Sequence, residues 1–284
     1  MGEGGVSSWW GNWGCCCDSD YPEEEQDNIC PCACYSFDET LEDMTGRQKP
    51  FEGEVVNYDE GILGHAYSVA PGSTIETPHA KCFTLTGGFS AWVWIYHGNC
   101  EGEAGGGGQQ VIRKGKGTQT TGEDHGTEWA FYTTTSCTQC NATTPNSVGF
   151  GVGNEGGVES SLSGPSIYGQ AISAGEYPVS TECFENHWTF YFMYFDPDEG
   201  EKGALYLMVD GDKNWSKKLL TKDAVTNTDP VFIGADIDPY STILVDNLGF
   251  CKDIGDEDEM KSRANFLFNE GYGKPCPKWI EDDA

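Results

Sequence analysis

The residues best suited to chemistry in this sequence are its 13 cysteines. So many cysteines in 284 residues favour an oxidising environment over the cytosol, and the odd count leaves at least one thiol outside any intrachain disulfide. Six of them cluster near the N-terminus: Cys15, Cys16, Cys17, Cys30, Cys32 and Cys34. In an extended segment the last three point one way, so the cluster suits disulfides or a soft metal ion, with free thiols as the third alternative.

A second, smaller group consists of Cys137 and Cys140, which two residues separate. We expect this pair at the tip of a hairpin, where either a local disulfide or half of a zinc site would fit. The spacing of the N-terminal cluster does not match a zinc finger, so disulfides are the preferred interpretation there.

Carboxylates dominate the rest of the ionisable residues. The chain has 46 Asp and Glu against 16 Lys and Arg, a formal charge of -30. This charge argues against nucleic acid and against anionic membranes as partners, whereas it suits a cationic partner or a divalent metal ion such as calcium. No apolar run is long enough to insert into a membrane, and the N-terminus shows neither a secretory signal nor an acylation motif.

Two segments predict strands that are aromatic on both faces. In FSAWVWIY (89–96) and HWTFYFMYF (187–195), the residues that alternate along the strand are apolar whichever face meets a second sheet. Either loops, the N-terminal segment or a second subunit cover the outer face, or the face is an aromatic surface for stacking sugars. We prefer the covered face; a sugar-binding surface would use Trp92, Trp94 and Tyr191.

The elements that must position these residues are short strands separated by Gly, Pro, Asn and Asp, the pattern of an antiparallel sandwich. Besides the two aromatic strands, the clearest are EWAFYTTT (128–135), VGFGVG (148–153), ALYLMVDG (204–211), PVFIGA (230–235) and STILVDNLGF (241–250). One helix is predicted in DEDEMKSRANFLFNEG, with Asp256 as N-cap and Gly271 at its end.

The order of these segments resembles the laminin-G-like, concanavalin A-like jelly-roll family. The resemblance covers residues 35–271 and is carried by YSFDETLEDMTGR, GILGHAYSV, STIETP, FSAWVWI, VIRKG, HWTFYFMYF, ALYLMVDGD, VFIGA and ILVDNLGFCKDI, in that order. It implies an all-β fold, a two-sheet antiparallel β-sandwich (jelly roll) with one short C-terminal helix and a Cys/Trp-rich N-terminal arm. The expected division is an arm (1–33), a jelly-roll domain (34–272) and an acidic tail (273–284).

By the same resemblance, Asp38 and Asp43 near the first strand and Asp246 near the last would converge on a calcium ion. The alternative is that Asp43 makes an Asx-type turn and Asp246 is a solvated strand residue. Hydrolase relatives of the fold carry Glu, any residue, Asp, any two residues, Glu on one strand, and this spacing is missing here.

The sequence therefore predicts a non-catalytic structural or adhesive module of a virion or extracellular assembly, which binds a glycan or protein surface. Its arm would join it to a homo-oligomer or a larger assembly. The alternatives are a calcium-dependent free lectin and a divergent polysaccharide hydrolase or lyase.

Overall fold

A computed structural model describes most of the predicted sandwich. The described residues are 31–54, 56–69, 73–100, 109–115, 127–133, 148–152, 187–210, 215–220, 223–224, 226–234, 241–252 and 254–276. Cys15, Cys16, Cys17, Cys30, Cys137 and Cys140 lie outside them, as does nearly all of the predicted arm.

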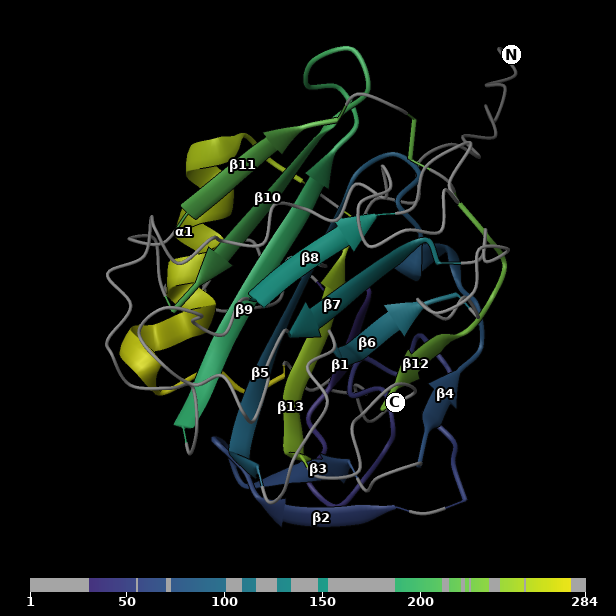
Figure 1. The fold of residues 1–284 in the computed structure, drawn as a ribbon, viewed down its shortest axis with the longest axis vertical. Helices are drawn as coiled ribbons and strands as arrows, with labels where there is room; N and C mark the ends of the chain where they lie inside the picture. The colour runs from purple at the N-terminus through teal and green to yellow at the C-terminus, as the bar shows by residue number, and fades with distance from the viewer. Residues whose placement is uncertain are drawn as a thin grey trace, which may run out of the picture.

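Two antiparallel sheets lie face to face (Figure 1). In the larger sheet the strand order is β11 (Trp215–Leu219), β10 (Ala204–Val209), β9 (His187–Asp196), β5 (Phe89–Cys100), β13 (Ser241–Cys251), β3 (His65–Val69) and β2 (Asn57–Glu60), and β1 (Ala33–Tyr35) also pairs with β13. In the smaller sheet the order is β4 (Ile75–Thr77), β12 (Val231–Ile233), β6 (Gln109–Lys114), β7 (Trp129–Thr133) and β8 (Val148–Val152). The predicted all-β sandwich is confirmed.

The core between the sheets is built from the alternate residues of each strand, as the period of two requires. Phe89, Val93 and Tyr191 point inward from the larger sheet, where they belong to the same buried cluster as Trp129 and Phe131 of the smaller one. One face of the two-sided aromatic strands thus meets the opposite sheet.

The outer face of the larger sheet is covered by α1 (Glu257–Phe268). Asp256 caps this helix by accepting a hydrogen bond from the Glu259 N–H at 2.9 Å, as predicted. The helix ends before the predicted Gly271, because Asn269 adopts the left-handed conformation at φ 48° and a 3₁₀ turn (Asn269–Gly271) follows. Within the described residues, no helix has the length and apolar character needed to cross a bilayer.

The sequence reading did not anticipate β2 and β11. Their sequences, NYDE and WSKKL, lack an alternating apolar pattern, because both strands lie at the edges of the larger sheet. Charged residues on edge strands discourage pairing with other chains. Such strands also lack the hydrophobic periodicity from which strands are predicted.

Candidate functional site

The predicted sugar-contact residues have packing partners in place of a ligand. Trp92 and Trp94 are 3% and 2% exposed on the outer face, and Tyr191 is fully buried between the sheets. The Trp92 ring lies over Gly249, where an added Cβ would come within 2.0 Å of it. Trp94 stacks on Phe268 of α1 with ring centroids 5.8 Å apart. The cover that the sequence assigned to loops, the arm or a second subunit is therefore this helix.

Two of the three predicted calcium ligands hold the same turn. Asp246 Oδ2 accepts hydrogen bonds from the N–H groups of Ile62 and Leu63, at 3.0 and 3.1 Å, and Asp38 Oδ1 accepts one from the N–H of His65 at 2.8 Å. Burial raises the pKa of the Asp246 carboxyl to about 8, and the nearby Asp38 carboxylate contributes to the rise. Beside them, Asn247 Oδ1 is buried and accepts no hydrogen bond from the described residues.

Asp43 does not join this pair, because its oxygens are already used in a turn of its own. They accept hydrogen bonds from the N–H groups of Cys34, Thr45, Arg47 and Gln48 and from the Thr45 hydroxyl, all between 2.7 and 3.1 Å. This is the Asx-type turn that the sequence left as the alternative. Across the residues that the structure describes, no three His, Cys, Asp or Glu side chains gather as a metal site.

Two of the clustered cysteines form disulfides with distant partners. Cys32 pairs with Cys82 across 50 residues, and Cys34 pairs with Cys276 across 242 residues. For these two the disulfide interpretation holds in the structure. Cys32 lies just before the predicted 34–272 domain and Cys276 just after it, so the two bonds tie residues on both sides of that domain to the sandwich. The exact domain boundaries stay a prediction.

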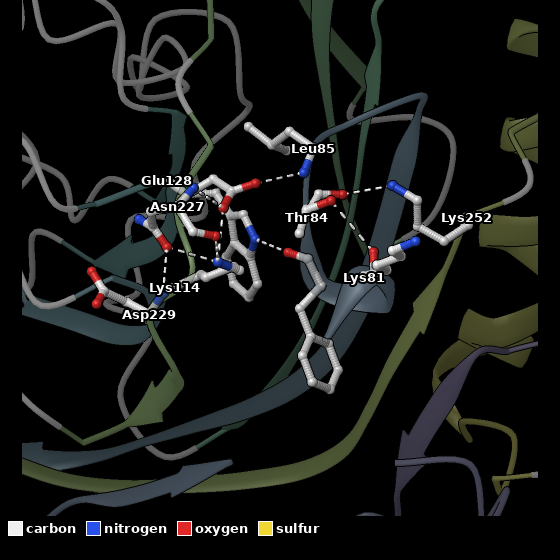
Figure 2. Close-up of polar contacts among 10 residues, drawn as sticks. Lys81, Thr84, Leu85, Lys114, Glu128, Asn227, Asp229 and Lys252 are labelled. Carbon is white, nitrogen blue, oxygen red and sulfur yellow. Dashed lines mark hydrogen bonds and ion pairs between the residues drawn. The ribbon is translucent and has the colours of Figure 1, made fainter. Parts of the chain in front are cut away.

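A polar network that the sequence reading missed lies at one end of the sandwich (Figure 2). Its centre is a fully buried ion pair, in which Lys114 Nζ lies 2.8 Å from Glu128 Oε2. Lys114 also donates to the backbone oxygen and the side-chain oxygen of Asn227, both at 2.7 Å. Glu128 in turn accepts from the N–H groups of Leu85 and Asn227, at 2.6 and 3.0 Å.

The same network fixes the 3₁₀ turn η1 (Lys81–Phe83) and the residues after it. Trp129 Nε1 donates to the Phe83 carbonyl at 2.7 Å, and Lys252 Nζ donates to the Thr84 carbonyl at 2.6 Å (Figure 2). Lys114 ends β6 and Glu128 directly precedes β7, so the pair ties both strands to two loops. These contacts make the network a structural tie between the two strands and the two loops.

The described strands carry no pair of carboxylates two residues apart on one face. Asp246 is the one acidic residue of β13, and the adjacent Asp59 and Glu60 of β2 point to opposite faces. The same-strand carboxylate pair that the hydrolase relatives carry is thus missing from the described strands.

No family model and no curated protein matches the sequence. Among solved structures, the fold is similar to that of domain 4 of AbnA, an extracellular GH43 arabinanase from Geobacillus stearothermophilus, in complex with arabinotriose. The TM-score is 0.50 at 16% identity, over 82% of this chain and 98% of that one. The fold is a jelly-roll-like β-sandwich. Its assignment to the laminin-G-like branch stays a prediction.

Similar structures also include two binding domains of botulinum neurotoxin D. For the receptor binding domain the TM-score is 0.54 at 12% identity, over 83% of this chain. For the serotype D ligand binding domain in complex with N-acetylneuraminic acid it is 0.51 at 12% identity, over 84% of this chain. The present chain spans about half the length of these toxin domains, 52% and 51%. At such identities the likeness establishes the fold alone.

Proposed function

We propose that this protein is a non-catalytic glycan-binding module that works outside the reducing cytosol. The observation that carries the proposal is the fold shared with domain 4 of the arabinanase over 98% of that domain, which was solved with arabinotriose. The sialic acid complex of a toxin binding domain supports the same class of ligand. Because a fold hosts many functions, the proposal depends on a binding test.

Two features of the chain itself support this assignment. The Cys32–Cys82 and Cys34–Cys276 disulfides suit an oxidising compartment. The polar groups at Lys114, Glu128 and Asp43 make structural hydrogen bonds, which supports a non-catalytic role. An extracellular filament or a virion surface would both provide the setting.

An array of neutral and sialylated oligosaccharides, probed with the full chain, tests the proposal. We expect retention of one glycan class and recovery of that glycan unchanged after prolonged incubation, as measured by mass spectrometry. Failure to bind any glycan would refute the binding role, and cleaved products would refute the non-catalytic one.

We also propose that the segment before Pro31 joins the module to an assembly. The residues directly after this segment, Pro31 and Cys32, are fixed to the sandwich. Arg47 Nη1 donates to the Pro31 carbonyl and Gln48 Nε2 donates to the Cys32 carbonyl. Cys32 also forms a disulfide with Cys82. Deletion of residues 1–30 preserves both disulfides. It should reduce the mass of the assembly in light scattering while the melting temperature stays the same; an unchanged mass would remove the anchoring role.

Calcium is proposed as a stabiliser of the turn at 61–65. Asp38, Asp246 and the buried Asn247 Oδ1 would supply oxygen ligands, and the ion would offset the repulsion between the two carboxylates. Calcium added to chelator-treated protein should raise the melting temperature of the wild type and leave Asp246→Asn unchanged. An unchanged wild-type melting temperature would exclude a site of useful affinity.

A further inference from the structure

The aromatic outer face of the larger sheet continues past the end of α1. Trp94 and Phe190 lie opposite each other on β5 and β9, and Phe268 at the C-terminal end of the helix packs on both rings. The next residues outward on the same face are Tyr96 and Trp188, which are also directly opposite each other. Figure 1 shows the last turn of α1 near the start of β9, and Trp188 is the second residue of that strand.

Tyr96 and Trp188 differ from the rings under the helix in being accessible. Trp94 and Phe190 are 2% and 0% exposed, whereas Tyr96 and Trp188 are each only partly buried. Their ring centroids are 5.6 Å apart and the ring planes are tilted by 52°. Two adjoining aromatic side chains therefore present part of their surface at the edge of the helix cover.

The row that contains this pair has an apolar floor and a polar edge. Leu244 of β13 pairs with Tyr96, and Ser68 of β3 pairs with Leu244, so the four side chains cross the sheet on one face. Leu244 is nearly buried, and Ser68 is partly exposed. An apolar surface with a hydroxyl at its margin suits a ligand that has both C–H and O–H groups.

An exposed tyrosine lies at the same end of the sheet. Tyr272 is 71% exposed, and the next residue, Gly273, approaches Trp94 so closely that an added Cβ would be 3.2 Å from Trp94 Nε1. Tyr272 follows directly from the last turns of the helix cover. It is the most exposed of the large hydrophobic side chains found in the described residues.

The charge around this surface selects against anions. The whole chain carries -30, and the Asp38 carboxylate lies near Asp246, whose strand partner Trp94 belongs to the row next to the aromatic pair. The cation that follows Gly273, Lys274, lies over the Phe266 ring at 4.7 Å. A negative potential lowers the local concentration of an acidic sugar but has no such effect on a neutral one.

We propose that Tyr96 and Trp188 form the stacking surface for a ring of a neutral oligosaccharide, with Tyr272 at its side. The assignment rests on the proposed glycan-binding function and deepens it by naming the surface and the ligand class. Aromatic side chains combine a large apolar face with a polar tip, so they hold a sugar ring by its C–H face while its hydroxyls stay hydrated.

The test uses the full chain and the neutral oligosaccharide that an array of neutral and sialylated glycans retains most strongly, with arabinotriose included. The variant is Trp188→Leu, and the matched control is Trp215→Leu. Trp215 is also a partly buried tryptophan of the larger sheet, but it packs on Tyr194 and Tyr206 away from the proposed surface. We expect Trp188→Leu to bind at least about tenfold more weakly by calorimetry, and Trp215→Leu to bind like the wild type.

The possible failures are distinguishable. A wild type that binds no glycan refutes the proposed function, whereas a wild type that binds while Trp188→Leu keeps full affinity refutes this surface only. Preference for a sialylated glycan over every neutral one refutes the neutral ligand class. If Trp188→Leu does not fold, fluorine NMR of 5-fluorotryptophan-labelled wild type decides instead: the Trp188 signal, assigned with Trp188→Phe, must shift on glycan addition, and an unmoved signal overturns the proposal.

Discussion

Replacing Glu128 with Gln keeps the shape of the side chain but leaves the buried Lys114 ammonium without its counter-ion. The Glu128 carboxylate accepts from Lys114 Nζ at 2.8 Å, from Leu85 N–H at 2.6 Å and from Asn227 N–H at 3.0 Å. A glutamine has one oxygen for these three donors, and its NH₂ group must face at least one of them. Breaking a buried pair in this way costs about 3 to 5 kcal/mol.

The measurement is urea unfolding with the disulfides intact, followed by tryptophan fluorescence. We expect the midpoint to fall with little change in the m-value, because the surface exposed on unfolding stays the same. The matched control is Asp223→Asn, which breaks the exposed pair between Lys202 and Asp223, also 2.8 Å long. Exposed pairs contribute about 1 kcal/mol or less. A loss in Glu128→Gln no larger than in this control would refute the structural role assigned to the buried pair.

Three further predictions concern stability. Burial raises the pKa of Asp210 from its ordinary value of 3.8 to about 6. The free energy of unfolding is therefore highest below pH 3.8, and it falls as the pH rises from there through 6. Asp210→Asn, which suits the residue's φ of 50°, should gain about 3 kcal/mol over wild type at neutral pH and nothing at pH 3 in urea titrations; an equal gain at both would contradict this. Gly249→Ala should lose roughly 2 kcal/mol and alter tryptophan fluorescence, because the new methyl group displaces the Trp92 ring; a wild-type midpoint would contradict the close contact. Replacing Cys34 and Cys276 together with Ala should cost about 4 kcal/mol in the same assay, and a cost near zero would contradict the long-range disulfide.

The strands that the sequence predicted are those with apolar alternation. The segments around Trp94, Phe190 and Phe250 form the centre of the larger sheet, where hydrophobic periodicity directly reflects burial. The helix start was also readable, since the Asp256 cap is a local interaction. The helix end was harder to predict, because Asn269 adopts the left-handed conformation two residues before the expected Gly271.

What the sequence left undetermined depends on contacts between distant segments. The partner of Cys34 is 242 residues away, so no local spacing indicates the bond. Lys114 and Glu128 lie in two separate predicted strand segments, VIRKG and EWAFYTTT, and only the folded sandwich encloses them together. The choice between a covered and an open aromatic face likewise depended on where α1 packs. The sequence of the helix does not determine that position.

The most direct test of the central claim is a binding measurement on the full chain with the strongest glycan from the array, followed by mass spectrometry of the recovered glycan. The account predicts saturable binding of a neutral oligosaccharide that is recovered intact and is lost in Trp188→Leu. Absence of binding to every glycan, or release of shortened products, would contradict it.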